Sequence, residues 1–429
     1  METISYGSLG AFVEALQLAL YRAGYLTSQQ SLDGVFGMNT QNAVLRFQRA
    51  NHLTPDGIVG PATWEQLIPY LTGYTTHTIA SGDTFYKIAR QYGSSPAAIS
   101  IANPDTNPYN LMIGRTLIVP FLFEVVSPLI PFNAMLCAYF IDGIVKRYPF
   151  VRAARIGSSI LGKPIWRLRI GDSRRRIAYN ASHHANEWIT SPIILRYAER
   201  LARSYIYGTE ISGVSAQEIL AQTSIDFIPL VNPDGVDLVT GWIKPDSQIY
   251  RDARRLAANY PEIPFPSGWK ANIAGVDLNL NYPASWETAR DIKYDQGFTM
   301  PGPRDYVGPY PLSEPESRAM VGVTNQNSYQ LTLSYHTQGK VIFWKYDGLE
   351  PPRSFEIGTR LANASGYALE ETPPESANAG YKDWFILNYN KPGYTIEAGL
   401  GVNPLPLSQF EEIYQDNEPL LTEAALSGD

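Results

Sequence analysis

The sequence has little cysteine, little histidine and no long hydrophobic run. Its one cysteine among 429 residues, Cys137, excludes a disulfide within the chain and says nothing reliable about the compartment. The apolar stretch of residues 121–132 contains Pro128 and Pro131 and is too short to span a membrane. Acidic residues outnumber basic ones by 41 to 34, and the net charge of −7 argues against nucleic-acid binding. No low-complexity tract occurs, so we expect a globular protein of several domains, one with a substantial core.

Three of the five histidines come where predicted strands end. His183 and His184 follow residues 176–182, which have the apolar character of a buried strand. His184 and Glu187 form an H-x-x-E motif, and the residues after it have helical periodicity. His336 follows another apolar run. The motif is therefore predicted at the carboxyl end of a strand, where open α/β sheets place their sites.

The residue types of this group fit a metal. Two imidazoles and one carboxylate, from His184, His336 and Glu187, make a three-ligand zinc site with an open position for water, as expected of catalytic zinc. Glu397, in a further apolar segment, can be the base that a zinc hydrolase needs. An H-x-x-E motif is common by chance, and the alternative is histidines with satisfied hydrogen bonds in the core or on the surface.

Around these residues the sequence resembles the zinc carboxypeptidase (M14) family, over about residues 132–425. The supporting motifs occur in the family's order along the chain: Val231–Gly235, Trp269-Lys270, Gly275–Asn279 and Gly380–Trp384. The resemblance implies one α/β domain, with a mixed central sheet of about eight strands flanked by helices.

The resemblance also assigns roles to residues of this chain. It implies that His184, Glu187 and His336 bind one zinc ion and that Glu397 is the general base. Lys270 falls where the family has an arginine that polarises the scissile carbonyl; a lysine supplies the charge without bidentate geometry.

Two further residues of the Gly275–Asn279 motif take roles from the resemblance. Asp277 falls where a carboxylate orients the first zinc histidine. Asn279 falls in the site for the substrate carboxylate.

Departures from the family pattern put ordinary C-terminal trimming in doubt. The family's asparagine–arginine pair for the terminal carboxylate is Asn279-Leu280 here, and another arginine of that site is Asn186. The family's mobile tyrosine, which caps the substrate, has no clear counterpart. Ungapped counting gives Glu375, and Tyr381 is a candidate.

The sequence also has a cationic residue, Lys382, that could replace the missing arginines. Lys382, directly before Asp383-Trp384, falls on the floor of the family's pocket for the leaving side chain. A lysine there predicts an acidic group on the substrate, and the alternative is an ordinary solvated surface lysine.

Two similar segments occur near the N-terminus, Asp33–Thr40 and Asp56–Thr63. Each is a glycine-rich turn followed by a helix start, with Thr40 or Thr63 expected near the N-cap. An amphipathic helix is predicted at Ala11–Leu20. This region resembles the peptidoglycan-binding type 1 module, a small three-helix fold.

The next segment, from His77–Ala89 to Leu111–Pro120, resembles a LysM module, a βααβ fold that binds N-acetylglucosamine in glycans. The alternative for both modules is a generic protein-interaction domain. We therefore predict domains at residues 1–72, 73–122 and 123–429, with a linker at about 121–131.

The combination indicates a bacterial peptidoglycan hydrolase that binds glycan strands and stem peptides. It resembles the γ-D-glutamyl-L-diamino acid (γ-D-glutamyl-meso-diaminopimelate) endopeptidases of the M14 family. The alternatives are a metallocarboxypeptidase acting on ordinary peptides and a non-catalytic wall-binding protein. Met1–Tyr6 has no basic region, and we see no secretory signal. We therefore expect cytoplasmic synthesis and action at the cell wall after lysis or in the sporulating cell.

Overall fold

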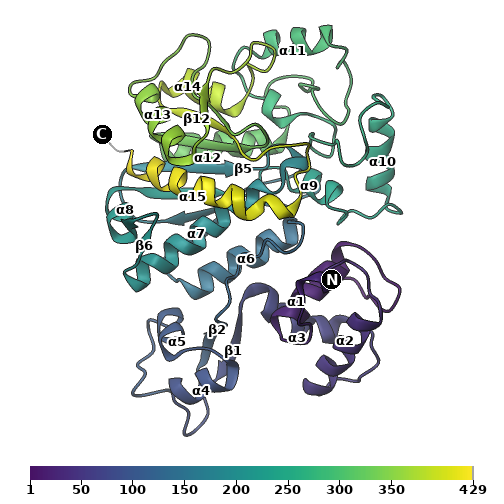
Figure 1. Cartoon of the computed structure of the whole chain (residues 1–429), viewed down its shortest axis with the longest axis vertical. Coiled ribbons are helices and arrows are strands. Elements are labelled where there is room, and N and C mark those ends of the chain that lie inside the picture. Colours follow the sequence, from purple (N-terminus) through teal and green to yellow (C-terminus); the bar gives the residue numbers. More distant parts are fainter. Residues whose placement is uncertain (428–429) are drawn as a thin grey trace. The chain divides into compact units, whose positions relative to one another are not determined.

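The computed structural model describes residues 1–427 and divides into two compact units (Figure 1). One unit is formed by Met1–Pro131 and Met135–Arg152, and the other by Phe132–Ala134 and the chain from Ala153 onward. None of the helices formed by residues 1–427 is long and apolar enough to cross a membrane.

The first unit begins with a three-helix module. Its helices are α1 (Ala11–Arg22), α2 (Met38–Ala50) and α3 (Pro61–Thr72), with a short 3₁₀ turn η1 (Gln29–Ser31). The expected amphipathic helix at Ala11–Leu20 is confirmed by α1.

The repeated segments of this module form two equivalent loops, and each wraps a buried glutamine. Gln17 accepts from the Gly34 N–H and donates to Asp33 and Thr40, while Gln48 makes the same contacts to the second loop. The threonines lie near the N-caps, as expected, but the N-cap residues are Gly37 and Gly60, and each threonine is the third residue of its helix. Their hydroxyls hold the glutamines.

The next part of the unit is the βααβ fold expected for residues 77–120. Strands β1 (Tyr74–Thr78) and β2 (Thr116–Pro120) pair antiparallel, with α4 (Phe85–Tyr92) and α5 (Pro96–Ala102) between them. Thr84 caps α4 by accepting from the Lys87 N–H.

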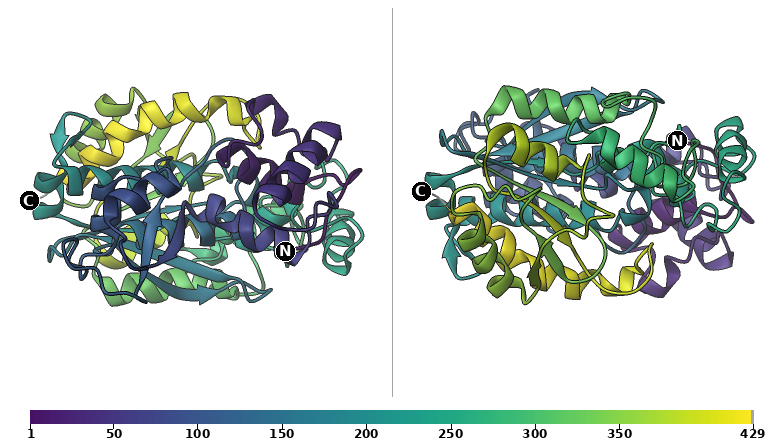
Figure 2. Two further views of the ribbon diagram at one scale, coloured as in Figure 1. Left: turned by 90° about the horizontal axis from the view of Figure 1, so that it is seen from below. Right: turned by 90° about the horizontal axis from the view of Figure 1, so that it is seen from above.

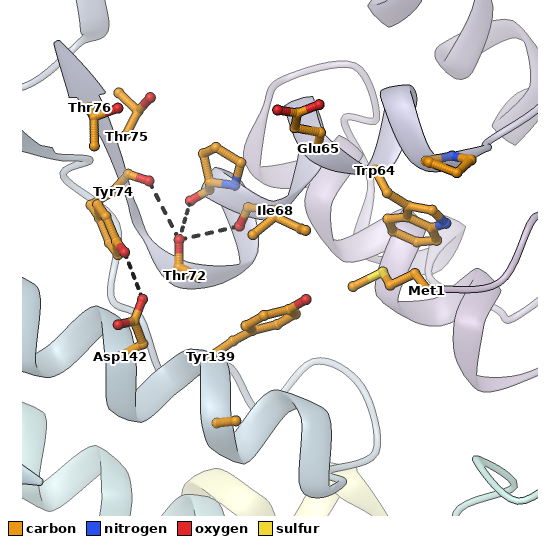
Figure 3. A pocket seen from close by; sticks show the side chains of 13 residues that line it. Met1, Trp64, Glu65, Ile68, Thr72, Tyr74, Thr75, Thr76, Tyr139 and Asp142 are labelled. Carbon is orange, nitrogen blue, oxygen red and sulfur yellow. Dashed lines mark hydrogen bonds between the residues drawn. The ribbon is translucent and has the colours of Figure 1, made fainter. Parts of the chain in front are cut away.

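The predicted linker is held in place rather than free. Helix α6 (Ala134–Arg147) follows it, and Arg147 donates to the carbonyls of Gly73, Phe121 and Phe123. A mostly apolar hollow of about 720 Å³ lies among α3, β1 and α6, where the Tyr74 hydroxyl donates to Asp142 (Figure 3). The boundary at residue 123 stays a prediction.

The second unit is built on an eight-stranded mixed sheet, which confirms the expected fold class. The strand order is β11-β10-β12-β9-β5-β8-β4-β3, with β5, β8, β9 and β12 mutually parallel and β4 and β10 antiparallel to their neighbours β8 and β12. The strands are β3 (Arg152–Ser158), β4 (Pro164–Ile170), β5 (Arg176–Ala181), β8 (Ser224–Ile228), β9 (Leu331–His336), β10 (Val341–Phe343), β11 (Ala368–Glu370) and β12 (Gly393–Glu397).

Helices cover both faces of this sheet (Figure 1 and Figure 2). Ala178 of β5 packs with residues of α12 and α14, whereas its neighbour Tyr179 contacts Tyr197 of α7 and donates to the Leu421 carbonyl of α15. Because both faces are buried, apolar side chains do not alternate with exposed polar ones along the strand. The longer helices are α7 (Thr190–Tyr207), α10 (Gln248–Ala257), α11 (Trp286–Asp295), α12 (Pro315–Asn327), α13 (Ser354–Ser365), α14 (Tyr381–Tyr389) and α15 (Phe410–Leu426).

Shorter elements complete the unit. They are η2 (Ala185–Glu187), the hairpin β6 (Glu210–Ile211) and β7 (Val214–Ser215), α8 (Ala216–Gln222), α9 (Pro233–Val239), η3 (Leu278–Leu280) and η4 (Leu407–Gln409).

Candidate active site

The carboxyl ends of three neighbouring parallel strands bring the candidate catalytic residues together. His184 follows β5, His336 ends β9, and Glu397 ends β12. The register pairs Glu397 with His336, and Tyr335 with Ala181. Residues that are far apart in the sequence therefore meet at one edge of the sheet, as expected for a parallel arrangement.

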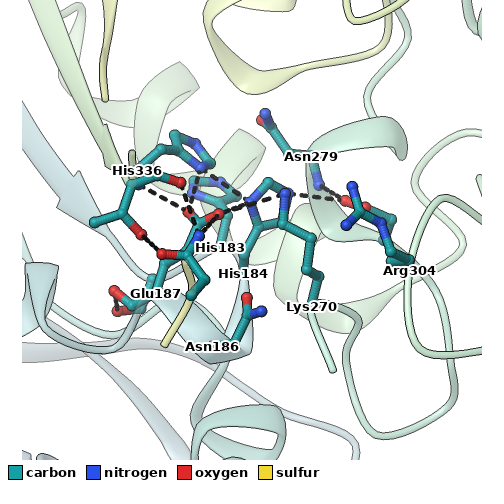
Figure 4. Close-up of polar contacts among 12 residues, drawn as sticks. His183, His184, Asn186, Glu187, Lys270, Asn279, Arg304 and His336 are labelled. Atoms are coloured by element: carbon teal, nitrogen blue, oxygen red, sulfur yellow. Dashed lines mark hydrogen bonds and ion pairs between the residues drawn. The ribbon is translucent and has the colours of Figure 1, made fainter. Parts of the chain in front are cut away.

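The side chains of His184, Glu187 and His336 converge with the geometry of a metal-binding group (Figure 4). The Nδ1 atoms of His184 and His336 lie 3.1 Å apart, and each is 2.9 Å from a carboxylate oxygen of Glu187. All three residues are buried. Two imidazoles and one carboxylate that face a common point fit a divalent cation, and zinc in particular.

Surrounding groups orient the three donors. The other ring nitrogen of His184, Nε2, lies 3.1 Å from Asp277 Oδ1, as expected for an orienting carboxylate. The Thr337 N–H donates to Glu187 Oε2, and the Asn403 amide lies 3.5 Å from Oε1. Asn403 was not among the sequence candidates, because no motif surrounds it.

The two histidines differ in protonation. Burial disfavours a charged His184, but the carboxylates of Glu187 and Asp277 outweigh burial and raise its pKa to about 9. Burial lowers the pKa of His336 instead. A cation that binds His184 Nδ1 must displace a proton, so metal affinity is expected to fall as the pH falls.

Comparison with known sequences identifies the scaffold that carries this group. The sequence model of the zinc carboxypeptidase family matches residues 138–419, well over half of the chain. The chain belongs to the zinc carboxypeptidase family. It is a peptidase-family protein with two further domains, since a peptidoglycan binding domain matches residues 10–67 and a LysM domain matches residues 77–120.

Individual relatives agree with this family. The chain is 44% identical to γ-D-glutamyl-L-diamino acid endopeptidase 1 of Lysinibacillus sphaericus, over 63% of this chain and 66% of that protein. It is 40% identical to the uncharacterized protein YqgT of Bacillus subtilis, over 66% of this chain and 74% of that protein. The carboxypeptidase A structure from Helicoverpa armigera has the same fold, with a TM-score of 0.53, 18% identity, and coverage of 83% of this chain and 98% of that chain.

Beside the metal-binding group, this zinc carboxypeptidase-family protein has a pocket of about 180 Å³ whose wall includes His184. The wall is densely charged and almost balanced. It contains four cations (Lys270, Lys293, Arg304 and Lys382) and four carboxylates (Asp277, Asp305, Asp383 and Glu397). A wall of this kind fits a substrate with several charged groups.

Glu397 and Lys270 lie on the side of the pocket nearest the metal-binding group. Burial and the nearby Glu187 carboxylate raise the pKa of Glu397 to about 8, and a bound cation would lower it again. Lys270 Nζ lies 3.4 Å from Glu187 Oε1, and this carboxylate outweighs burial and raises the lysine pKa. The site therefore combines a proton acceptor with a fixed cation.

Lys382 is a buried residue of the pocket wall, with 4% of its surface exposed, and not a solvated surface lysine. Its ammonium group lies 2.7 Å from Asp383 Oδ1 and donates to the Lys345 carbonyl and the Thr372 hydroxyl. Asn279 and Leu280 also line the pocket. Leu280 leaves an apolar surface where the family has its arginine.

Tyr381 does not lie where the substrate-binding expectation put it. It is fully buried in the core under α14, its hydroxyl bonds to Thr324 at 2.8 Å, and its ring packs against Tyr282 and Trp384. The expectation that Tyr381 caps a substrate is therefore wrong, because the apolar face of α14 carries its ring away from the pocket.

Two other positions from the sequence interpretation lie outside the pocket wall: Asn186, expected in the substrate-carboxylate site, and Glu375, given by ungapped counting for the capping tyrosine. The Asn186 amide donates to the Ser267 carbonyl, and Asn186 is not part of the pocket wall. Glu375 lies on an exposed segment whose neighbour Ser376 lines the pocket.

The sequence interpretation missed three charged residues of the pocket: Lys293, Arg304 and Asp305. Lys293 lies on α11, while the other two belong to an irregular proline- and glycine-containing loop without periodicity. The available signal was indirect, because the loss of family cations at Asn186 and Leu280 calls for replacements elsewhere in the chain.

Proposed function

We propose that the protein is a zinc-dependent peptidoglycan hydrolase that cleaves the γ-D-glutamyl–diaminopimelate bond of stem peptides. The name of the Lysinibacillus relative supports this bond, and the two N-terminal domains support peptidoglycan as the polymer. The site supports hydrolysis because the metal-binding group adjoins a pocket that also contains the Glu397 carboxylate and the Lys270 ammonium group.

In this proposal His184, Glu187 and His336 hold zinc, which when bound supplies a Lewis acid that stabilises developing negative charge. Glu397 accepts a proton from the attacking water, in the ionised form that a bound cation favours. Water oxygen bonds to the γ-carbonyl carbon while the Lys270 ammonium faces the oxyanion. Glu397 then gives its proton to the departing amine as the C–N bond breaks.

The observation that carries the choice of substrate is the buried ammonium group of Lys382 in the same pocket as Glu397. A buried cation in a binding pocket favours an anionic partner. Meso-diaminopimelate has a carboxylate at the far end of its side chain, and lysine and alanine do not. A metallocarboxypeptidase for peptides that end in neutral or basic residues gains nothing from this lysine.

Digestion of defined muropeptides tests the function. We expect purified protein with about one zinc per chain to release diaminopimelate-containing fragments from L-Ala-γ-D-Glu-meso-diaminopimelate, with cleavage only at the γ-D-glutamyl bond. Mass spectrometry of the products identifies the cleaved bond, and elemental analysis of the protein measures its zinc content. A chelator should stop the reaction and added zinc should restore it. Cleavage of ordinary peptides alone would support the carboxypeptidase alternative, and no cleavage of either would support a wall-binding protein.

The N-terminal domains are proposed to hold the enzyme on insoluble peptidoglycan. We expect the full chain carrying Glu397→Gln, which leaves the wall intact, to sediment with purified sacculi. A chain that starts at residue 132 should bind at least about tenfold more weakly, because tethered modules raise the effective concentration of the peptidase at the polymer.

The shortened chain needs a folding control, since α6 packs with the N-terminal domains. Its wild-type form should still contain zinc and cleave soluble muropeptides. Equal sedimentation of the two chains would show that residues 1–131 are not the anchor.

A further inference from the structure

The guanidinium group of Arg304 is a cation of the pocket, and only its Nε atom donates a hydrogen bond within residues 1–427. Its Nε donates to Asp305 Oδ2 at 2.5 Å, while neither terminal nitrogen has a hydrogen-bond partner among residues 1–427. The side chain is 43% exposed, and it lines the same pocket as Lys382 and Glu397. A guanidinium with two free N–H groups on one side is the donor that matches both oxygens of a carboxylate.

Asp305 occupies only one side of the Arg304 guanidinium group. Asp305 is shared between two cations, because its Oδ1 lies 2.8 Å from Lys293 and its Oδ2 receives the Arg304 bond. Burial works against ionisation of Asp305, but the two cations lower its pKa, so the carboxylate is charged. Because Asp305 contacts Arg304 through Nε alone, the two terminal nitrogens of the guanidinium group can still bind an anionic group of a substrate.

The loop that carries Arg304 is fixed to the metal-binding side of the site. The N–H groups of Lys270 and Ala271 both donate to the Pro303 carbonyl, at 2.7 and 2.9 Å. The Asp305 N–H donates to Asp277, which in turn contacts His184. These bonds tie the loop of Arg304 to the segments of Lys270 and Asp277, whereas Lys382 bonds to a different segment, through the Lys345 carbonyl and the Thr372 hydroxyl.

We propose that Arg304 is a specificity-determining residue that binds the carboxylate on the α-carbon next to the cleaved bond, while Lys382 takes the distal carboxylate. The inference rests on the proposed function and deepens it. Two separate cationic groups in one small pocket fit a dicarboxylic leaving residue. The enzyme is then selective for stem peptides in which the diaminopimelate carboxylate beside the γ-D-glutamyl bond is free.

Two matched substrates test this assignment: L-Ala-γ-D-Glu-meso-diaminopimelate and the same peptide with only that carboxylate converted to a primary amide. We expect the wild-type enzyme to favour the acid by about ten- to a hundredfold in kcat/KM. Arg304→Met should lower kcat/KM for the acid to near the value for the amide, and Arg304→Lys should restore part of the preference. Lys382→Met should keep the preference, because it does not contact this carboxylate.

The outcomes separate the inference from the function on which it rests. Equal cleavage of acid and amide by the wild-type enzyme overturns the role of Arg304, whatever the folding of any variant, and leaves the proposed function intact. Equal losses on both substrates in a zinc-replete Arg304→Met variant overturn it as well. Failure of the wild-type enzyme to cut either peptide at the γ-D-glutamyl bond overturns the proposed function itself.

Discussion

Glu397→Gln is expected to lower kcat/KM on the muropeptide by about 10²- to 10⁴-fold while the zinc content stays at one per chain. The amide has nearly the same shape as the carboxylate, but it cannot accept the proton of the attacking water. Glu397 also stands outside the converging group of His184, Glu187 and His336, so metal binding does not depend on its charge. Steady-state kinetics and elemental analysis on the same preparation measure the two quantities.

Glu187→Gln is the matched control, because it makes the same carboxylate-to-amide change within the metal-binding group. Its carboxylate contacts both histidines at 2.9 Å, so this variant is expected to lose zinc and activity together. Loss of zinc from Glu397→Gln would make Glu397 a metal ligand and would refute its assignment as the base.

Lys382→Met is expected to lower kcat/KM for the γ-D-Glu–diaminopimelate peptide about ten- to a hundredfold more than for the γ-D-Glu–Lys analogue. The distal carboxylate of diaminopimelate is the group that the ammonium would bind, and the lysine analogue lacks it. The ammonium group of Lys382 donates two hydrogen bonds, to the Lys345 carbonyl and the Thr372 hydroxyl, and lies 2.7 Å from Asp383 Oδ1. A substrate carboxylate would compete with these contacts, and the bond to the Thr372 hydroxyl, at 3.2 Å, is the longer of the two hydrogen bonds.

Lys345→Met is the matched control for this change. This substitution also removes one lysine charge, from the neighbouring segment. The Lys345 side chain pairs with Glu350 and Glu371 and does not line the pocket. We expect small and equal effects on both substrates. Because Lys382→Met also leaves the buried Asp383 carboxylate without its cation, thermal unfolding and zinc content of the variant must be compared with the wild type. If Lys382→Met lowers kcat/KM equally for the two substrates, Lys382 does not bind the distal carboxylate and its role is structural.

Features that depend on neighbours in the sequence were predictable without the structure. The turn at His184–Glu187 joins a buried strand to a helix, and both signals lie within a short segment. The repeated Asp-Gly turns before two helices also follow from local patterns. The βααβ order came from the resemblance to the LysM module, and the structure confirms it. The mixed eight-stranded sheet came from the family resemblance, and the structure confirms it.

The sequence by itself determined which residues could hold a metal and which could accept a proton, because residue type and strand-end position decide that chemistry. Only the tertiary structure decided which groups share the pocket. Tyr381 turns into the core, where its ring packs against Tyr282, and Asn403 lies beside Glu187 across a large sequence separation. Arg304 lies on an irregular loop, which has no helical or strand periodicity by which the sequence could predict it. Its position depends on hydrogen bonds to segments near Lys270 and Asp277, and such long-range bonds form only when the whole domain is folded.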